Sequence, residues 1–428
     1  MINQNNSNSK IGKIIKITDS VIDLEFNTLP NINNLIKIIT KDNVEYTFEV
    51  LQHLTITSCR ALAYQDFTNL ACDDLAIDTG KQVQIPTGQN SYQDLLNKTF
   101  DSLGNCINSL NSDQIKKIDN HNSIPRLEEL TQSQKLIYTG IPIVDLLFPL
   151  AINSKIAIFT TSNTNNNLYY NLIKVFTKIN NNPIVFVEVA KSLKEIEELD
   201  SRIDQYDLTN RSIRVQSQTN QTAINRLRSV TSGIAIVSNL RDINQQDSFF
   251  FLDGGMECLQ ANVEISKLLG KELPNVASNS LQIIANIEEK ISSTKKANIT
   301  SIQKILVTEP TVNNFLNHLD STLVLDKDCR INYQESYSKN LTRSMVGSKH
   351  VELAFEVNKI LSNYKKIKEK ITNTNWNDLT LKEQEEVVKG KKIEDLLYSN
   401  VGSNTKSKPD ISDFDSLLDS VENCLDLT

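Results

Sequence analysis

Glycine is scarce in this chain. Its 428 residues include 12 glycines, whereas average composition would supply about 30. Glycine is the residue that lets a backbone adopt left-handed conformations or approach a ligand closely. The chain has therefore lost, or never had, many positions at which such a backbone is required.

Cysteine and histidine are also few, and they are scattered. The six cysteines, at positions 59, 72, 106, 258, 329 and 424, form no CxxC pair, so we expect neither a zinc site nor a disulfide framework. The four histidines are equally dispersed, at positions 53, 121, 318 and 350. Metal binding by His and Cys is therefore disfavoured.

Long apolar runs and an excess of positive charge are missing as well. No run of eighteen apolar residues is present, and the first residues, MINQNNSNSKIGK, lack the apolar stretch of a secretory signal. We therefore expect a cytoplasmic protein, free or peripheral on the inner face of the cell membrane, without direct membrane insertion. The net charge of -7 argues against binding nucleic acid.

The pattern of apolar residues divides the chain into three predicted domains. In SVIDLEF, residues 20–26, apolar and polar positions alternate, and VEYTFEV, residues 44–50, alternates again. Several such short strands predict a β-barrel, which with the polar tail makes a domain over residues 1–82.

Residues 83–345 alternate between short apolar runs and helical stretches such as KSLKEIEELDSRIDQY. This pattern predicts a central doubly wound, mostly parallel α/β sheet. The runs expected to form its strands are KIAIF, IVFVEV, IAIVS, FFFLD, QIIANI and KILVTE.

Residues 346–428 form a predicted helical domain. One apolar stripe follows helical spacing, at Leu353, Val357, Ile360, Tyr364, Ile367 and Ile371. After a polar linker comes an acidic final helix, whose apolar residues could pack on the domain or on a partner.

Most of the chain resembles the catalytic beta subunit of the rotary, proton-translocating ATP synthase. YTGIPIVDLLFPLAINSKIAIF, residues 138–159, is similar to the segment before that family's phosphate loop, and FFFLDGGMECLQANVEISKLLGKELPNV to its Walker B strand and following helix. The resemblance runs in order from about residue 11 to about residue 398. It implies a P-loop-type (RecA-like) fold, with alpha-type and gamma-type ATP synthase subunits or a ring of paralogues as partners.

The residues that bind phosphate and magnesium in that family's phosphate loop are replaced in this sequence. The pattern requires glycines for close backbone approach, a lysine for the phosphates and Ser or Thr for magnesium. Its glycines fall on Thr160 and Asn165, its lysine on Asn166 and its hydroxyl residue on Asn167. The loop, which includes Thr161, is therefore a degenerate nucleotide site, and we predict that it does not grip phosphate.

The resemblance places the general base at Lys191 and a neighbouring arginine at Ser192. A cation cannot accept the proton of the attacking water, so no catalytic residue is expected. Glu195 matches an acidic position of the family. Lys191 and Lys194 are expected to be solvated residues at a helix start, although they could instead attract a phosphate.

Only one part of the magnesium site matches. Asp253 corresponds to the Walker B aspartate and could hold Mg²⁺, but an aspartate at a strand end can equally cap a helix or pair with a lysine. The other acidic position maps to Gln221, and an arginine position to Glu257.

The adenine-stacking tyrosine aligns near Asn332 or Tyr333 in a shortened segment. The positions that complete the alpha subunit's non-catalytic site are Val351 and Phe355.

These replacements predict a pseudo-catalytic, beta-like structural subunit that does not turn over ATP and needs no cofactor. One alternative is a divergent but active beta subunit that uses Mg-ATP. The other is a regulatory module that senses nucleotide without hydrolysing it.

Overall fold

The computed structural model describes residues 10–87, 91–108, 115–119, 124–131, 135–161, 167–271, 273–306, 318–371, 379–398 and 411–426. The chain divides into two compact units. The first contains Met1–Leu130 and Pro183–Asn298, and the second contains Thr131–Asn182 and Ile299–Thr428. The domain boundaries predicted after residues 82 and 345 stay predictions. No helix in the described part of the chain is long and apolar enough to cross a membrane.

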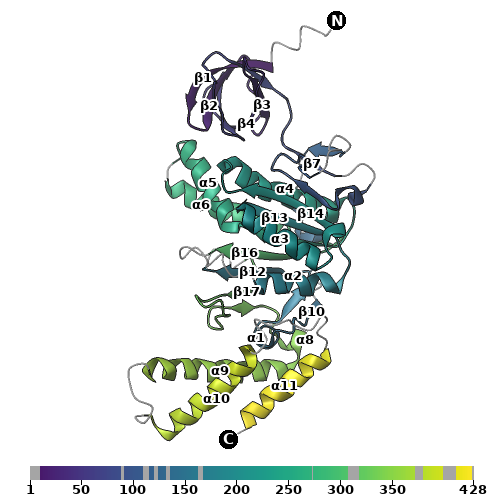
Figure 1. Cartoon of the computed structure of the whole chain (residues 1–428), viewed down its shortest axis with the longest axis vertical. Helices are drawn as coiled ribbons and strands as arrows, with labels where there is room; N and C mark the ends of the chain where they lie inside the picture. Colours follow the sequence, from purple (N-terminus) through teal and green to yellow (C-terminus); the bar gives the residue numbers. More distant parts are fainter. Residues whose placement is uncertain are drawn as a thin grey trace. The chain divides into compact units, whose positions relative to one another are not determined.

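The first unit begins with the predicted barrel. Its strands are β1 (Ile11–Thr18), β2 (Val21–Phe26), β3 (Leu35–Ile39), β4 (Glu45–His53), β5 (Ser58–Ala63) and β6 (Leu75–Asp78). They close in the order β1-β2-β5-β4-β3-β6 (Figure 1). Ile22, Leu24 and Phe26 are buried at alternate positions of β2, as the sequence alternation predicts. The barrel therefore has its own apolar core.

Four parallel strands of the first unit follow the order β15-β13-β14-β8. They are β8 (Lys98–Phe100), β13 (Ile184–Lys191), β14 (Ser212–Gln218) and β15 (Ser248–Asp253). The helices of this unit are α3 (Leu193–Gln205), α4 (Ala223–Asp242), α5 (Gly255–Leu268) and α6 (Leu273–Lys290). A small antiparallel pair joins β7 (Gln84–Pro86) and β9 (Lys117–Asp119), and three 3-10 turns are η2 (Tyr92–Leu95), η4 (Leu127–Glu129) and η5 (Thr209–Arg211).

The second unit has its own strands, in the order β18-β17-β12-β16. Strand β12 (Lys155–Thr160) pairs in parallel with β16 (Ile299–Leu306) and β17 (Ser321–Val324), and β18 (Tyr337–Ser338) is antiparallel to β17. A short hairpin-like pair joins β10 (Lys135–Ile137) and β11 (Leu150–Ile152), with α1 (Pro142–Leu147) between them. Helix α2 (Asn167–Ile179) follows β12.

The C-terminal helices of the second unit are α8 (Arg343–Val346), α9 (Ser348–Ile371), α10 (Leu381–Tyr398) and α11 (Ile411–Asp426). Figure 1 shows α9, α10 and α11 packed side by side. The acidic helix α11 packs on its own unit, because the Phe414 ring lies 5.0 Å from Tyr138 and 4.9 Å from His350.

The structure confirms the predicted fold class: an N-terminal β-barrel, a central parallel-sheet domain and C-terminal helices. Two of the predicted strands are wrong. IAIVS, residues 234–238, lies inside α4, and QIIANI, residues 282–287, lies inside α6. Helix α4 is buried on most of its surface, and such a helix lacks the polar face that would distinguish its sequence from a buried strand. Strand β14 was not predicted for a different reason: its sequence, SIRVQSQ, contains no continuous apolar run.

Candidate functional site

The residue at the general-base position lies at the end of β13. Lys191 is the last residue of this strand and is 2% exposed, so the expectation that it is a solvated helix residue is wrong. Ala190 adopts a φ of 54°, a left-handed conformation that a non-glycine residue rarely takes. The pairing of β13 with β14 also shifts register between Glu188 and Lys191. This irregularity ends the regular strand just before the lysine.

The ammonium group of Lys191 contacts the Walker B position. Its Nζ atom lies 2.8 Å from Oδ1 of Asp253, the last residue of β15. The two strands run in parallel with Glu188 opposite Asp253, so their carboxyl ends lie at the same edge. Pairing with a lysine, one of the roles considered for Asp253, is therefore present here.

Two further carboxylates surround the same ammonium. Glu195 Oε1 lies 4.0 Å from Lys191 Nζ, and the charge of Glu257 also acts on it. Burial disfavours the ammonium, but Asp253, Glu257 and Glu195 together outweigh burial and raise the pKa of Lys191. Oε2 of Glu257 is buried without a hydrogen-bond partner in the described residues. Lys191 is therefore a charged group held by acidic neighbours on several sides.

The residues that follow Lys191 begin a helix. Ser192 is the N-cap of α3; its backbone N–H donates to Oε2 of Glu195 at 2.9 Å, and its Oγ accepts a longer bond from the Glu195 N–H. This reciprocal pair is a capping box. Burial disfavours the charged form of Glu195, but the hydrogen bonds from Ser192 and the charge of Lys191 lower its pKa. Lys194, in the first turn of α3, is exposed as expected.

A glycine fixes the chain direction after Asp253. Gly254 has a φ of 123°, and a Cβ atom there would lie 2.6 Å from Cβ of Val189. Both the conformation and the close approach exclude a larger residue. In this glycine-poor chain, Gly254 is retained where β15 turns into α5 against β13.

The predicted phosphate-loop residues belong to the second unit. Thr160 ends β12 and is 3% exposed, Thr161 is exposed, and Asn167 is the exposed first residue of α2. Asn165 and Asn166 lie outside the described residues. The structure therefore shows the strand and the helix that flank this loop. That the loop does not hold phosphate stays a prediction.

The remaining predicted positions have local structural partners. Oη of Tyr333 donates to the Leu361 carbonyl at 2.8 Å, within the second unit. Gln221, in the first unit, accepts a bond from the Gln218 N–H at 3.1 Å. Phe355, on α9, is 71% exposed.

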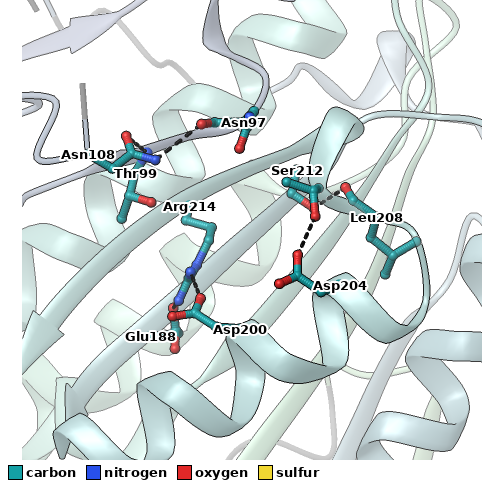
Figure 2. Close-up of polar contacts among 10 residues, drawn as sticks. Asn97, Thr99, Asn108, Glu188, Asp200, Asp204, Leu208, Ser212 and Arg214 are labelled. Carbon is teal, nitrogen blue, oxygen red and sulfur yellow. Dashed lines mark hydrogen bonds and ion pairs between the residues drawn. The ribbon is translucent and has the colours of Figure 1, made fainter. Parts of the chain in front are cut away.

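A second charged cluster on β13 was missed by the sequence analysis. Arg214 of β14 donates from Nη2 to Oε2 of Glu188 at 2.7 Å and also pairs with Asp200 of α3 (Figure 2). Burial raises the pKa of Glu188 to about 7, although Arg214 opposes this shift. The sequence signal was an arginine within SIRVQSQ and a glutamate within IVFVEV, both inside strands, where an unpaired charge is costly.

Polar groups beside Arg214 hold the neighbouring elements in place. Asn108 Nδ2 donates to the Asn97 carbonyl at 3.1 Å, and the Thr99 N–H donates to Oδ1 of Asn108 at 2.9 Å. The Ser212 hydroxyl donates to the Leu208 carbonyl at 2.7 Å. Figure 2 shows these contacts, and Asn97, Thr99, Asn108, Ser212 and Arg214 also line a cavity of about 480 Å³. Their hydrogen bonds to one another favour a structural role.

Residues 140–335 match the family model described as ATP synthase alpha/beta family, nucleotide-binding domain. The matched segment includes β12, β13 and β15, and with them Lys191 and Asp253. The match covers less than half of the chain and makes this segment similar to that family's nucleotide-binding domain, in agreement with the parallel sheet described above.

Proposed function

We propose that this chain is a non-catalytic, beta-like subunit of a rotary ATP synthase or ATPase assembly. The family match over residues 140–335 supports the assembly class. The observation that carries the non-catalytic assignment is the ion pair of Lys191 with Asp253, because it involves the two positions at which the resemblance requires a base and a magnesium ligand.

The charge of Lys191 opposes hydrolysis. A general base must accept, or strongly orient, a proton of the attacking water. Lys191 is buried among Asp253, Glu195 and Glu257, and its pKa is raised, so it stays protonated at neutral pH. A protonated ammonium has no lone pair with which to accept a proton.

The degenerate phosphate loop supports the same conclusion. Hydrogen bonds to charged groups contribute about 1.5–3 kcal/mol each. The loss of two or three would weaken ATP binding by roughly a thousandfold or more. We therefore propose that the chain needs no cofactor, and that Mg-ATP would be its ligand only if it were a divergent active enzyme.

The proposed role is assembly, with alpha-type and gamma-type subunits or a ring of paralogues as partners. The barrel core and the packed C-terminal helices support it, since these parts of the fold persist while the chemical positions are replaced. A hetero-oligomer of this kind needs correctly shaped surfaces from each member, whether or not that member turns over ATP.

Calorimetry with ATP, with and without Mg²⁺, tests the loss of nucleotide binding. We expect no micromolar affinity under either condition, and no ATP hydrolysis by the purified chain. Micromolar binding that Asp253→Ala abolished would contradict the proposal and would favour an active or nucleotide-sensing protein.

Isolation from the native membrane fraction tests the assembly role. A tagged chain should bring down alpha-type and gamma-type subunits in a fixed ratio, and the same purification from cells with the untagged chain is the control. Recovery of the tagged chain as a free monomer would contradict the role in assembly.

A further inference from the structure

The resemblance implies a magnesium ion next to Asp253, and the residues around it do not fit one. Mg²⁺ takes oxygen ligands at about 2.0–2.1 Å in near-octahedral geometry. Oδ1 of Asp253 instead has the Lys191 ammonium at 2.8 Å. In the described part of the chain, no group of three or more His, Cys, Asp or Glu side chains is placed to hold a metal.

We propose that the ε-ammonium of Lys191 takes the place of the divalent cation. It is a cation tethered to the chain, and Asp253 is its nearest carboxylate. This inference deepens the proposed non-catalytic function and rests on it. It gives Asp253 a role in a chain whose phosphate-loop and general-base positions are replaced.

The ammonium is far more buried than in an ordinary surface ion pair. The Lys191 side chain is 3% exposed and that of Asp253 is 17% exposed. Glu195 Oε1 lies at 4.0 Å, and Glu257 has a buried Oε2 without a hydrogen-bond partner among the described residues. The ammonium thus contacts Asp253, lies 4.0 Å from Glu195 and is also attracted by the charge of Glu257.

Removing that ammonium would leave the carboxylates to repel one another. Like charges at short range in a partly buried site are unfavourable, and a free divalent cation would relieve them. In the wild-type chain a metal would instead have to displace a buried, covalently attached cation and leave it unpaired. Wild-type protein should therefore be indifferent to Mg²⁺, and a variant without the ammonium should respond to it.

The experiment compares the wild-type chain with Lys191→Met, using Mn²⁺ binding by electron paramagnetic resonance and thermal unfolding with and without Mg²⁺. Methionine retains most of the side-chain length and removes the charge. Lys194→Met is the matched control, because it removes an exposed lysine from the first turn of α3. We expect Lys191→Met to bind Mn²⁺ at least about tenfold tighter than the wild type or the control. Its thermal midpoint should rise with Mg²⁺, and theirs should not.

Two results would overturn the inference. One is Mn²⁺ binding by the wild-type chain that Asp253→Asn removes. The other is a folded Lys191→Met variant that binds Mn²⁺ no better than the wild type.

A double-mutant cycle keeps the inference testable if Lys191→Met folds poorly. Asp253→Asn alone should lower the thermal midpoint, because it leaves the buried ammonium with weaker partners. The thermal midpoint of the combined Lys191→Met and Asp253→Asn variant should fall by less than the sum of the two single decreases, since neither charge is then left without its partner. Strictly additive losses would overturn the pairing.

These results can be separated from those that test the proposed function. A chain that binds Mn²⁺ through Asp253, yet co-isolates with alpha-type subunits and hydrolyses no ATP, would refute the tethered cation alone. A metal-indifferent chain that purifies as a free monomer would refute the assembly role and leave the tethered cation supported.

Discussion

Strand β13 carries two buried charged clusters whose central charges have opposite signs. Near its middle, the buried carboxylate of Glu188 is held by the guanidinium of Arg214. At its end, the buried ammonium of Lys191 is held by Asp253 and by the charges of two glutamates. The first cluster is built on regular parallel strands, and the second follows an irregular residue, Ala190.

The two clusters differ in how their charge is fixed. Glu188 has a pKa raised to about 7 by burial, so its protonation changes near neutral pH. The pKa of Lys191 is raised from a value that is already high, so its charge is constant over the same range. A structural ion pair tolerates a partner whose protonation changes near neutral pH. A permanent substitute for a metal cation requires a charge that stays constant.

The largest effect is expected from breaking the cluster at Glu188. Arg214→Met would leave Glu188, whose side chain is 4% exposed, without its cation. Removing one partner of a buried ion pair costs about 3–5 kcal/mol, and urea unfolding would measure this loss. Lys194→Met, an exposed cation on α3, should change stability by less than about 1 kcal/mol. Equal losses in the two variants would show that Arg214 has no special structural role.

A smaller loss is expected from Gly254→Ala, which perturbs the cluster at Lys191 through the backbone. The alanine Cβ would meet Val189 at 2.6 Å in a conformation with φ at 123°. Strain of this kind costs about 1–3 kcal/mol, measurable by urea unfolding. Gly270→Ala is the control, since it also has a positive φ but no atom within 4 Å of its added Cβ. A loss no greater than that of the control would mean that the contact with Val189 is unimportant.

The sequence predicts the barrel and most of the sheet because their signals are local. Alternation in residues 20–26 follows directly from the two faces of a strand, and Ile22, Leu24 and Phe26 are buried as expected. The run at 234–238 is apolar but helical, since burial on most sides of α4 removes the period by which the two structures differ. The run at 282–287 is helical as well, although Ile284 is its only buried residue.

The chemistry of the candidate site was harder to predict than the fold. The positions of Lys191 and Asp253 follow from the resemblance, but their 2.8 Å contact joins residues that are far apart in sequence. Adjacent parallel strands bring their carboxyl ends to one edge, which was the available signal. The lysine was instead predicted at a helix start, because KSLKEIEELD has the pattern of an amphipathic helix, and α3 indeed begins at Leu193, two residues later.

A pH series would sharpen the contrast between the two clusters. Because Glu188 has a higher pKa when folded than its usual 4.5, the folded state binds more protons between about pH 4.5 and 7. The stabilisation that Glu188 contributes is therefore fully present below about pH 4.5 and is lost as the pH rises to 7. Urea unfolding should show this loss, about 3 kcal/mol for a rise of the pKa from 4.5 to about 7, in the wild type.

Glu188→Gln removes the titrating group and should flatten that part of the pH profile. The variant is expected to be less stable overall, because Arg214 loses the charge of its buried partner. Lys191→Met provides the comparison, since the pKa of Lys191 is raised above its usual 10.5 and the lysine releases no proton in this range. An unchanged slope in Glu188→Gln would assign the pH dependence to another group.

The smallest effect is expected at the exposed side of the cluster on β13. Asp200 pairs with Arg214, but its side chain is 47% exposed, so solvent screens the attraction. Asp200→Asn should therefore cost about 0.5 kcal/mol in urea unfolding, because Arg214 keeps its bond to Glu188 at 2.7 Å. A loss as large as that of Arg214→Met would show that the exposed aspartate, and not the buried glutamate, is the main partner of this arginine.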